Sequence, residues 1–165
     1  MIDDFSSTDF EEVLAVINDG ASAYKGVIPE NCWHEPYMPP SELREGIEAG
    51  IKFRVCRSED NNILGVMGVQ PVQDVYLIRH AYVKTDAWRN GIGSRLIEDI
   101  NTVTDAPVLI GTWAAAKWAI QFYERHGFHL LDAEETRLLL KKYWSVPDLQ
   151  IEHSVVLADQ NWLPA

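Results

Sequence analysis

The chain has 165 residues, 47% of them hydrophobic, so it is long enough for one domain with its own core and too short for two ordinary domains. Its 14 Lys and Arg residues against 25 Asp and Glu residues give a formal net charge of −11, which repels phosphate polyanions and anionic lipid surfaces. Length and charge therefore predict a single domain over residues 1–165 that binds neither nucleic acid nor membranes.

The first part of the chain predicts two helices joined by an irregular loop. From Thr8 to Ala23 apolar residues recur three and four positions apart, which is typical of an amphipathic helix. The segment 26–42, GVIPENCWHEPYMPPSE, is rich in proline and aromatic residues and cannot be helical throughout, because proline lacks a backbone donor. We expect Ser41 to cap a second, short helix that runs through Glu48.

The middle of the chain predicts a strand meander followed by a helix. Three β-like runs, 51–57, 63–69 and 75–83, are separated by turn formers and predict antiparallel strands. Beyond them the pattern changes from period two to helical. The apolar residues that then share one helical face are Ile92, Leu96, Ile97 and Ile100.

The last third predicts further elements of the same sheet and its helices. Residues 107–110 are expected to form a short buried strand, and Thr112 to cap a helix that starts at Ala114 and ends before Gly127. A helix over 134–143 and a strand over 151–157 follow, and that strand, placed at a sheet edge, could pair across a homodimer. The order of elements predicts an α/β or α+β fold with one central sheet.

Cysteine usage and the N-terminal segment indicate the compartment. Cys32 and Cys56 lie far apart and outside any CxxC spacing, which favours a reducing environment, and we expect the cytoplasm. The segment MIDDFSSTDFEE is acidic where a signal peptide would be basic, and no apolar run approaches the ~20 residues of a membrane span. Cys32, His34 and Glu35 lack the paired spacing of a zinc site, so no metal is expected.

A glycine turn at the start of the third predicted helix is the strongest chemical signal. VKTDAWRNGIGSRLI places Gly91 and Gly93 where a strand gives way to a helix. The first amides of a helix have no internal partner and carry positive partial charge, so an anion such as a pyrophosphate can bind there. Ser94 could add a hydroxyl donor, and Arg89 a charge-assisted contact to phosphate.

Two better-known phosphate loops do not fit this turn. The dinucleotide fingerprint would need glycine at Leu96, and the P-loop needs a Gly-Lys pair that the chain lacks. The alternative interpretation is a tight turn that only lets the helix pack closely on the sheet. Glycine spacing alone leaves both interpretations open.

Two segments resemble the signatures of the GNAT superfamily of N-acetyltransferases. VKTDAWRNGIGSRLI resembles the acetyl-CoA motif, written [QR]-x-x-G-x-[GA], and WAIQFYERHGF resembles the second signature, in which A-x-x-[FY]-Y-E precedes Gly-Phe. They occur in the family's order between Val83 and Phe128. The resemblance implies a mixed, mostly antiparallel sheet flanked by helices and splayed at the cofactor cleft, between the strands that end at Val83 and Ile110.

The resemblance also implies how acetyl-CoA is held, without a metal. Tyr82 and Val83 would pair with the pantetheine amides as an added strand would. The chain departs from the family at Trp88, where Gln or Arg is usual, and at Ala116, where an asparagine is common. The backbone amides that would cradle the pyrophosphate are those of Arg89, Asn90, Gly91, Ile92, Gly93 and Ser94.

Acyl transfer to an amine needs an oxyanion donor, an acid for the thiolate and a base for the amine. The resemblance makes Tyr123 the acid and the Val83 amide the oxyanion donor. His80 is the candidate base from its unperturbed pKa, although strand parity places Arg79, not His80, on the face of Val83. His34 and Glu35, acting through water, remain alternatives.

The aromatic loop corresponds to the region that shapes the acceptor pocket in this family. Trp33, Glu35 and Tyr37 would suit an ammonium group, because aromatic faces beside a carboxylate attract cations. The alternative is a flap that packs Trp33 and Tyr37 on the core, and Trp118 is expected to be a core residue.

These observations predict an acetyl-CoA-dependent N-acetyltransferase that acts on the primary amine of a small molecule or peptide by direct attack in a ternary complex. One alternative is a non-catalytic module that binds or senses acyl-CoA. The other is an interaction protein in which the glycine turn only packs a helix.

Overall fold

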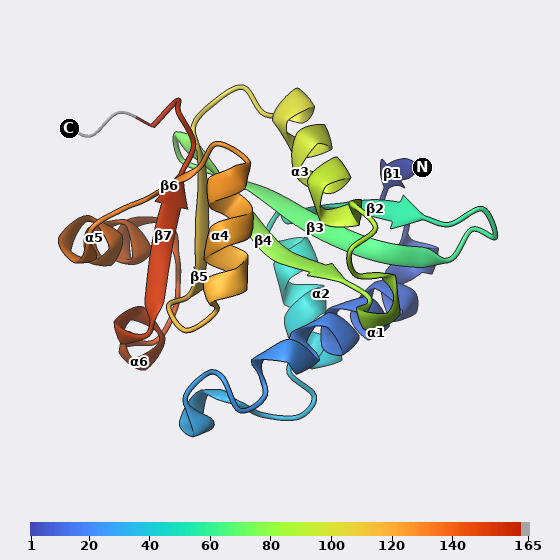
Figure 1. Cartoon of the computed structure of the whole chain (residues 1–165), viewed down its shortest axis with the longest axis horizontal. Helices are drawn as coiled ribbons and strands as arrows, with labels where there is room; N and C mark the ends of the chain where they lie inside the picture. The colour runs from blue at the N-terminus through green and yellow to red at the C-terminus, as the bar shows by residue number, and fades with distance from the viewer. Residues whose placement is uncertain (163–165) are drawn as a thin grey trace.

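A seven-stranded sheet runs through the centre of the protein, with helices on both faces (Figure 1). The computed structural model describes residues 1–162. The strands are β1 (Ile2–Asp4), β2 (Lys52–Arg57), β3 (Ile63–Val72), β4 (Val75–Val83), β5 (Val108–Trp113), β6 (His129–Leu130) and β7 (Ser154–Ala158). The helices are α1 (Phe10–Ala21), α2 (Pro40–Glu48), α3 (Ile92–Val103), α4 (Lys117–Arg125), α5 (Ala133–Tyr143) and α6 (Asp148–Glu152).

The sheet is mixed and mostly antiparallel, as the GNAT resemblance implied. Its strand order is β1-β2-β3-β4-β5-β7-β6, and only the central β4–β5 pair is parallel. The β2–β3–β4 meander confirms the three predicted β runs. The parallel pairing covers only residues 76–78 of β4 and 108–110 of β5, although both strands continue beyond it. The sheet therefore splits between β4 and β5, in the place that the GNAT resemblance implied.

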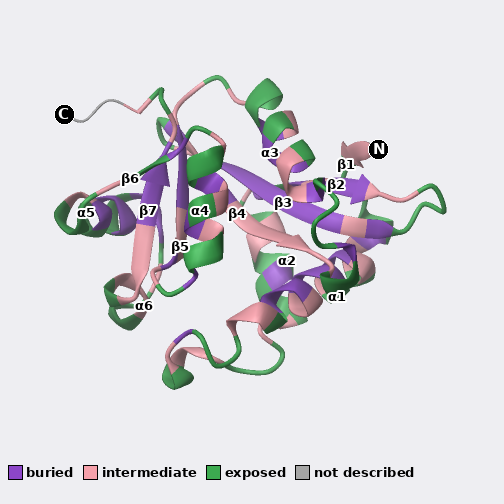
Figure 2. Cartoon of the chain, in the orientation of Figure 1, coloured by how far each residue is buried: buried purple, intermediate pink, exposed green. Residues whose placement is uncertain are grey.

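Each face of the sheet is covered by its own helices. The amphipathic pattern of α3 is confirmed, because Ile92, Leu96, Ile97 and Ile100 are all buried, with Tyr123 and Phe128 from the α4 region in the same cluster. The opposite face packs α1 and α2 on β2 and β3, and α5 on β5 and β7. In Figure 2 the strands are largely buried while the helices expose their outer sides. Burying each large aliphatic side chain contributes roughly 1.5–3 kcal/mol.

Two predicted helix caps, at Ser41 and Thr112, and the predicted end of the strand 107–110 are wrong for physical reasons. Ser41 does not cap α2, because Pro40 occupies the first helical position, where a missing N–H costs nothing. Thr112 does not cap α4, because β5 continues through Trp113 in its pairing with β7. That pairing keeps Thr112 in the strand, and α4 starts at Lys117. Gly127, with a φ of +88°, does end that helix as expected.

The C-terminal strand is shorter than predicted and is not at the edge of the sheet. Residues 148–152 form α6, which Pro147 precedes, and β7 begins only at Ser154. β7 lies between β5 and β6, a strand of 2 residues that the sequence did not reveal. The predicted edge strand for a homodimer is therefore wrong at this position. None of the helices within residues 1–162 has both the length and the apolar character needed to cross a membrane.

Candidate functional site

Two cavities lie at the split between β4 and β5. A cavity of about 720 Å³, here called the α3 cavity, is bounded by the start of α3, the end of β4 and one side of α4. A second cavity of about 410 Å³, here called the loop cavity, lies between the aromatic loop, β4 and the segment that leads from α5 to β7. Tyr24, Tyr82 and Thr112 line both. The split therefore brings two separate binding spaces to a common junction.

The start of α3 presents unpartnered backbone donors to the α3 cavity. Gly91 precedes the helix with a φ of +72°, a conformation that glycine adopts without strain. The first i to i−4 bond runs from the Arg95 N–H to the Gly91 carbonyl, at 3.0 Å. The N–H groups of residues 92–94 thus have no partner within the helix, and positive partial charge collects there. Arg89 also lines the cavity.

Gly93 is needed for packing as well as for access. A Cβ at this position would lie 3.2 and 3.3 Å from ring atoms of Phe122 on α4. A Cβ at Gly65 would lie 2.7 Å from Ile92. The start of α3 therefore sits tightly between β3 and α4, which holds its free amides at the cavity. The packing interpretation of the glycine turn and the anion-binding interpretation both fit this geometry.

Ser94 lines the α3 cavity, but its hydroxyl is bonded to His126, which corrects the expectation of a free hydroxyl donor. His126 Nδ1 lies 2.8 Å from the Phe122 carbonyl, which can only accept, so Nδ1 donates. In neutral His126, Nε2 then accepts from the Ser94 hydroxyl at 3.0 Å. The Asn90 Nδ2 group donates to the Ala87 carbonyl at 3.0 Å, and Asn90 does not line the cavity. No sequence pattern singled out His126, which bonds Ser94 across the α3–α4 contact.

At the end of β4 the backbone N–H and carbonyl of Val83 face the split between β4 and β5. The Lys84 N–H donates to the Leu64 carbonyl at 2.8 Å, and antiparallel ladders alternate bonded and non-bonded pairs. The N–H and carbonyl of Val83 therefore face away from β3, and Trp88 Nε1 donates to that carbonyl at 2.9 Å. Tyr82 is in the bonded pair with Val66, so its backbone faces β3 and it lines the cavities with its side chain. This corrects the expectation that the Tyr82 backbone is free.

A β-bulge in β4 overturns the parity prediction for Arg79 and His80. The β3–β4 register shifts between Val66 and Gly68, and His80 has a φ of +55°. Ala81 and Val83 then pack in the cluster on the α3 face, whereas Arg79 and His80 both line the loop cavity. The reason is the extra residue, which shifts the alternation of side chains by one position.

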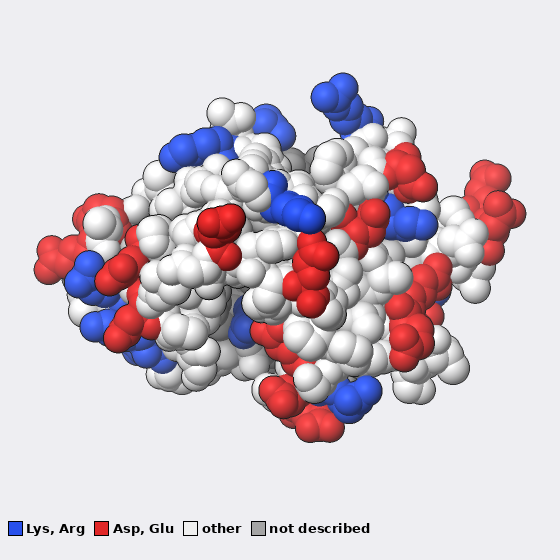
Figure 3. All heavy atoms as spheres, turned by 90° about the horizontal axis from the view of Figure 1, so that it is seen from below, with Lys and Arg blue, Asp and Glu red and all other residues white. Residues whose placement is uncertain are grey.

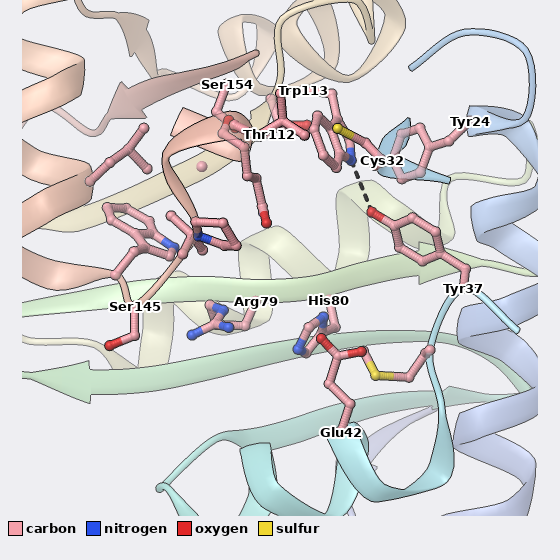
Figure 4. Close-up of a pocket in the computed structure, with 18 of the residues that line it drawn as sticks. Tyr24, Cys32, Tyr37, Glu42, Arg79, His80, Thr112, Trp113, Ser145 and Ser154 are labelled. Carbon is pink, nitrogen blue, oxygen red and sulfur yellow. Dashed lines mark hydrogen bonds between the residues drawn. The ribbon is translucent and has the colours of Figure 1, made fainter. Parts of the chain in front are cut away.

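His80 is enclosed and uncharged at neutral pH. Its ring stacks on Phe53 with a centroid distance of 6.2 Å. Burial, helped by the nearby Arg79 charge, lowers the pKa of His80 from 6.5 to about 3. Glu42 extends from α2 toward His80, and both line the loop cavity (Figure 4). Glu42 was missed in the sequence because its helix position carries no motif.

Tyr123 is buried beside the junction and lines the α3 cavity. Its ring makes an edge-on contact with Phe128, at a centroid distance of 6.0 Å. Burial is the main reason that the pKa of Tyr123 is raised, and the neighbouring Tyr24 adds to it. The phenol therefore keeps its proton at neutral pH. That is the state a general acid requires.

The aromatic loop contributes Tyr37 to the loop cavity, but not Trp33 or Glu35. The Tyr37 hydroxyl accepts a hydrogen bond from Trp113 Nε1 at 2.9 Å, and burial raises the pKa of Tyr37 to about 12. The Trp33 ring packs against Tyr37 in a tilted arrangement with a centroid distance of 5.4 Å, as the flap alternative expected. Glu35 is exposed and pairs with Lys25 at 2.9 Å, so it points away from the cavity.

Trp118 is not the core residue that its helical spacing predicted. Its side chain is 45% exposed, its ring lies 5.9 Å from that of Tyr24, and it lines the α3 cavity. A helix face that borders a cavity has the same apolar period as one that borders a core, so the sequence cannot distinguish them.

Comparisons with known proteins agree with this geometry. Residues 50–130 match a family model described as an acetyltransferase (GNAT) domain. No curated protein matches the sequence significantly. The matched region contains the β2–β3–β4 meander, the glycine turn, α3, β5 and α4.

Several solved structures are similar over nearly the whole chain. The PaiA N-acetyltransferase of Thermoplasma acidophilum, in complex with coenzyme A, is 16% identical with a TM-score of 0.71, covering 96% of this chain and 97% of that chain. A GNAT-family acetyltransferase of Staphylococcus aureus MU50 is 16% identical with a TM-score of 0.68, at the same coverage of 96% and 97%. The ribosomal-protein-S18-alanine N-acetyltransferase of Escherichia coli is 14% identical with a TM-score of 0.67, covering 100% and 96%. At these identities the likeness to solved structures shows the fold alone. The family match shows that residues 50–130, which carry the central meander, the glycine turn and α4, are a GNAT acetyltransferase domain.

Proposed function

We propose that this protein transfers an acetyl group from acetyl-CoA to the primary amine of an acceptor by direct attack within a ternary complex. The observation that carries the proposal is the junction of two cavities at the β4–β5 split. One cavity offers unpartnered helix amides to an anion, and the other is lined by aromatic and ionisable side chains. A donor and an acceptor bound on opposite sides would meet beside Tyr24, Tyr82 and Thr112.

The residues around the α3 cavity fit coenzyme A. The N–H groups of residues 92–94 would bind its pyrophosphate, and Arg89, which lines the same cavity, would add charge. The Val83 N–H, which faces away from β3, would bind the donor at the split. Trp88 stands where the family usually has Gln or Arg. Its Nε1 donates to the Val83 carbonyl, so Trp88 would help to hold the end of β4 in place beside the donor.

Acetyl-CoA supplies a thioester. The amine nitrogen of the acceptor attacks its carbonyl carbon, so a C–N bond forms and the C–S bond breaks. The Val83 N–H would donate to the carbonyl oxygen as negative charge develops there. Tyr123 would donate its proton to the departing sulfur, because burial keeps the phenol protonated. Its position on the wall of the α3 cavity supports this role.

The amine must also lose a proton. Attack makes the nitrogen positive and strongly acidic, so a weak base within reach is sufficient. His80 and Glu42 both face the loop cavity. A pKa of about 3 makes His80 a weak base, which favours Glu42 as the first acceptor of the proton.

The decisive experiment combines binding with turnover. A melting assay with coenzyme A tests whether the folded protein binds it, since a ligand of the folded state raises stability. Thiol release from acetyl-CoA is then followed with a panel of primary amines. Tyr123→Phe should reduce release by about 100-fold or more while coenzyme A still stabilises the protein.

The matched control is Tyr143→Phe. Tyr143 is also a buried tyrosine, but it bonds Asp74 and lines neither cavity. It should leave release unchanged. A protein that binds coenzyme A but releases no thiol with any amine would be the non-catalytic module instead, and one that does not bind it would refute the proposal.

A further inference from the structure

We propose that the acceptor is a small amino carboxylate, and that Arg79 binds its carboxylate group at the end of the loop cavity away from the junction. This inference rests on the proposed N-acetyl transfer and names the substrate class of the same site. Among the described residues that line the loop cavity, Arg79 is the only Lys or Arg and Glu42 the only Asp or Glu.

Arg79 has few partners within the protein. Its Nη1 donates to Gln70 Oε1 at 3.0 Å. Gln70 Nε2 in turn donates to the Ala49 carbonyl at 3.1 Å, which fixes the amide so that its oxygen faces the guanidinium. A guanidinium has five N–H donors, so most of those of Arg79 remain available to a ligand. Arg79 is thus held in place from one side only.

The contrast with two other arginines makes this position unusual. Arg54 pairs with Asp4 and Asp99, and Arg57 pairs with Asp3 and Asp9. No ion pair within residues 1–162 includes Arg79, although it is largely enclosed. Enclosing an unpaired cation is costly unless an anion compensates it. Burial lowers the pKa of Arg79, and the charge of Glu42 raises it in part.

The loop cavity therefore has opposite charges in one small space. Glu42 would attract the amine end of an acceptor and Arg79 its anionic end, which together suit a zwitterion. A simple alkylamine would gain from Glu42 but be repelled by Arg79. Seen from below, the surface is hollowed and a basic side chain is visible inside the hollow, among acidic groups on the surrounding surface (Figure 3).

The layout of the cavity gives the acceptor a direction. In Figure 4, Arg79 and Ser145 lie toward one end, and Tyr24 and Tyr37 lie toward the other. Tyr24 belongs to the junction with the α3 cavity. An acceptor with its carboxylate on Arg79 would therefore point its amine at the split. A volume of about 410 Å³ suits a small molecule, and a singly charged carboxylate matches one guanidinium.

The experiment compares amino carboxylates with their own amides. Glycine, β-alanine, γ-aminobutyrate and a set of L-α-amino acids are each tested beside the corresponding primary amide, and kcat and KM are measured by thiol release. The same compounds are tested for binding by calorimetry in the presence of coenzyme A. We expect at least one amino carboxylate to exceed its amide by about 100-fold or more in kcat/KM, which corresponds to one lost charge-assisted pair.

Arg79→Gln should remove this preference, mainly by raising KM, and Arg79→Lys should restore it in part. Arg137→Gln, an exposed residue of α5 that lines neither cavity, removes the same charge and should change nothing. Equal rates with acids and amides, or an equal loss with both in Arg79→Gln, would overturn the inference. If no amine releases thiol, the proposed function fails, and binding decides whether Arg79 recognises a carboxylate. Coenzyme A affinity shows that each variant is folded.

Discussion

Replacing His80 by Asn tests whether the bulge of β4 buries the His80 side chain so that it stays uncharged in the folded protein. Asparagine tolerates the φ of +55° at this position better than most residues, so the backbone should be preserved. In the folded protein burial lowers the pKa of His80 from 6.5 to about 3. Between these two values the unfolded chain binds a proton that the folded chain does not.

The sign of the effect follows from that difference. Folding stability should fall as the pH falls below about 6.5, by about 1.4 kcal/mol per pH unit, and this loss should end near pH 3. Between about pH 7.5 and about pH 5 the contribution of His80 amounts to about 2 kcal/mol. His80→Asn removes this contribution but leaves those of the other groups.

Urea unfolding of both proteins at these two pH values measures the difference. The unaltered protein should lose about 2 kcal/mol more than His80→Asn on acidification. Equal losses would mean that the histidine accepts a proton freely in the folded state. In that case the enclosed environment that we assign to the Arg79–His80 bulge would be wrong.

Three further outcomes are expected. Gly93→Val should raise the Kd for coenzyme A at least ~10-fold, because a side chain there overlaps Phe122 at the start of α3; an unchanged Kd would show that the tight contact is not needed. Trp113→Phe should cost about 1 kcal/mol in urea unfolding, since it removes the donor to the enclosed Tyr37 hydroxyl, and no loss would contradict that bond. Between pH 5 and 8 the activity of His80→Asn should depend on pH in the same way as that of the unaltered protein, because the pKa of His80, about 3, lies below this range. A fall in activity that occurs in the unaltered protein but not in His80→Asn would show that His80 titrates within this range.

The elements with strong local signals could be predicted from the sequence. The α3 face and the β2–β3–β4 meander follow from hydrophobic period and turn residues, and both are present. The glycine turn was placed correctly because two closely spaced glycines mark the point where the strand pattern changes to a helical one. The glycine turn and the two GNAT signatures singled out residues 92–94 and Tyr123, and all of these line the α3 cavity; their roles stay predictions.

The parts that failed depend on contacts between distant segments. The bulge at His80 arises from the register of β4 against β3, which no local pattern records, and it turned Arg79 into a cavity residue. The continuation of β5 through Trp113 depends on its pairing with β7, where Trp113 lies opposite Ser154, a residue far away in the sequence. Glu42 reaches the site only because α2 packs on β2 and β3, next to β4, so its place in the site could not be predicted from the sequence.

The most direct measurement is a crystal structure of this protein with coenzyme A. We predict that the pyrophosphate lies within hydrogen-bonding distance of the N–H groups of residues 92–94, with the thiol beside Tyr123 in the split between β4 and β5. A coenzyme bound elsewhere, or with its sulfur away from the junction of the two cavities, would contradict the proposed arrangement of donor and acceptor.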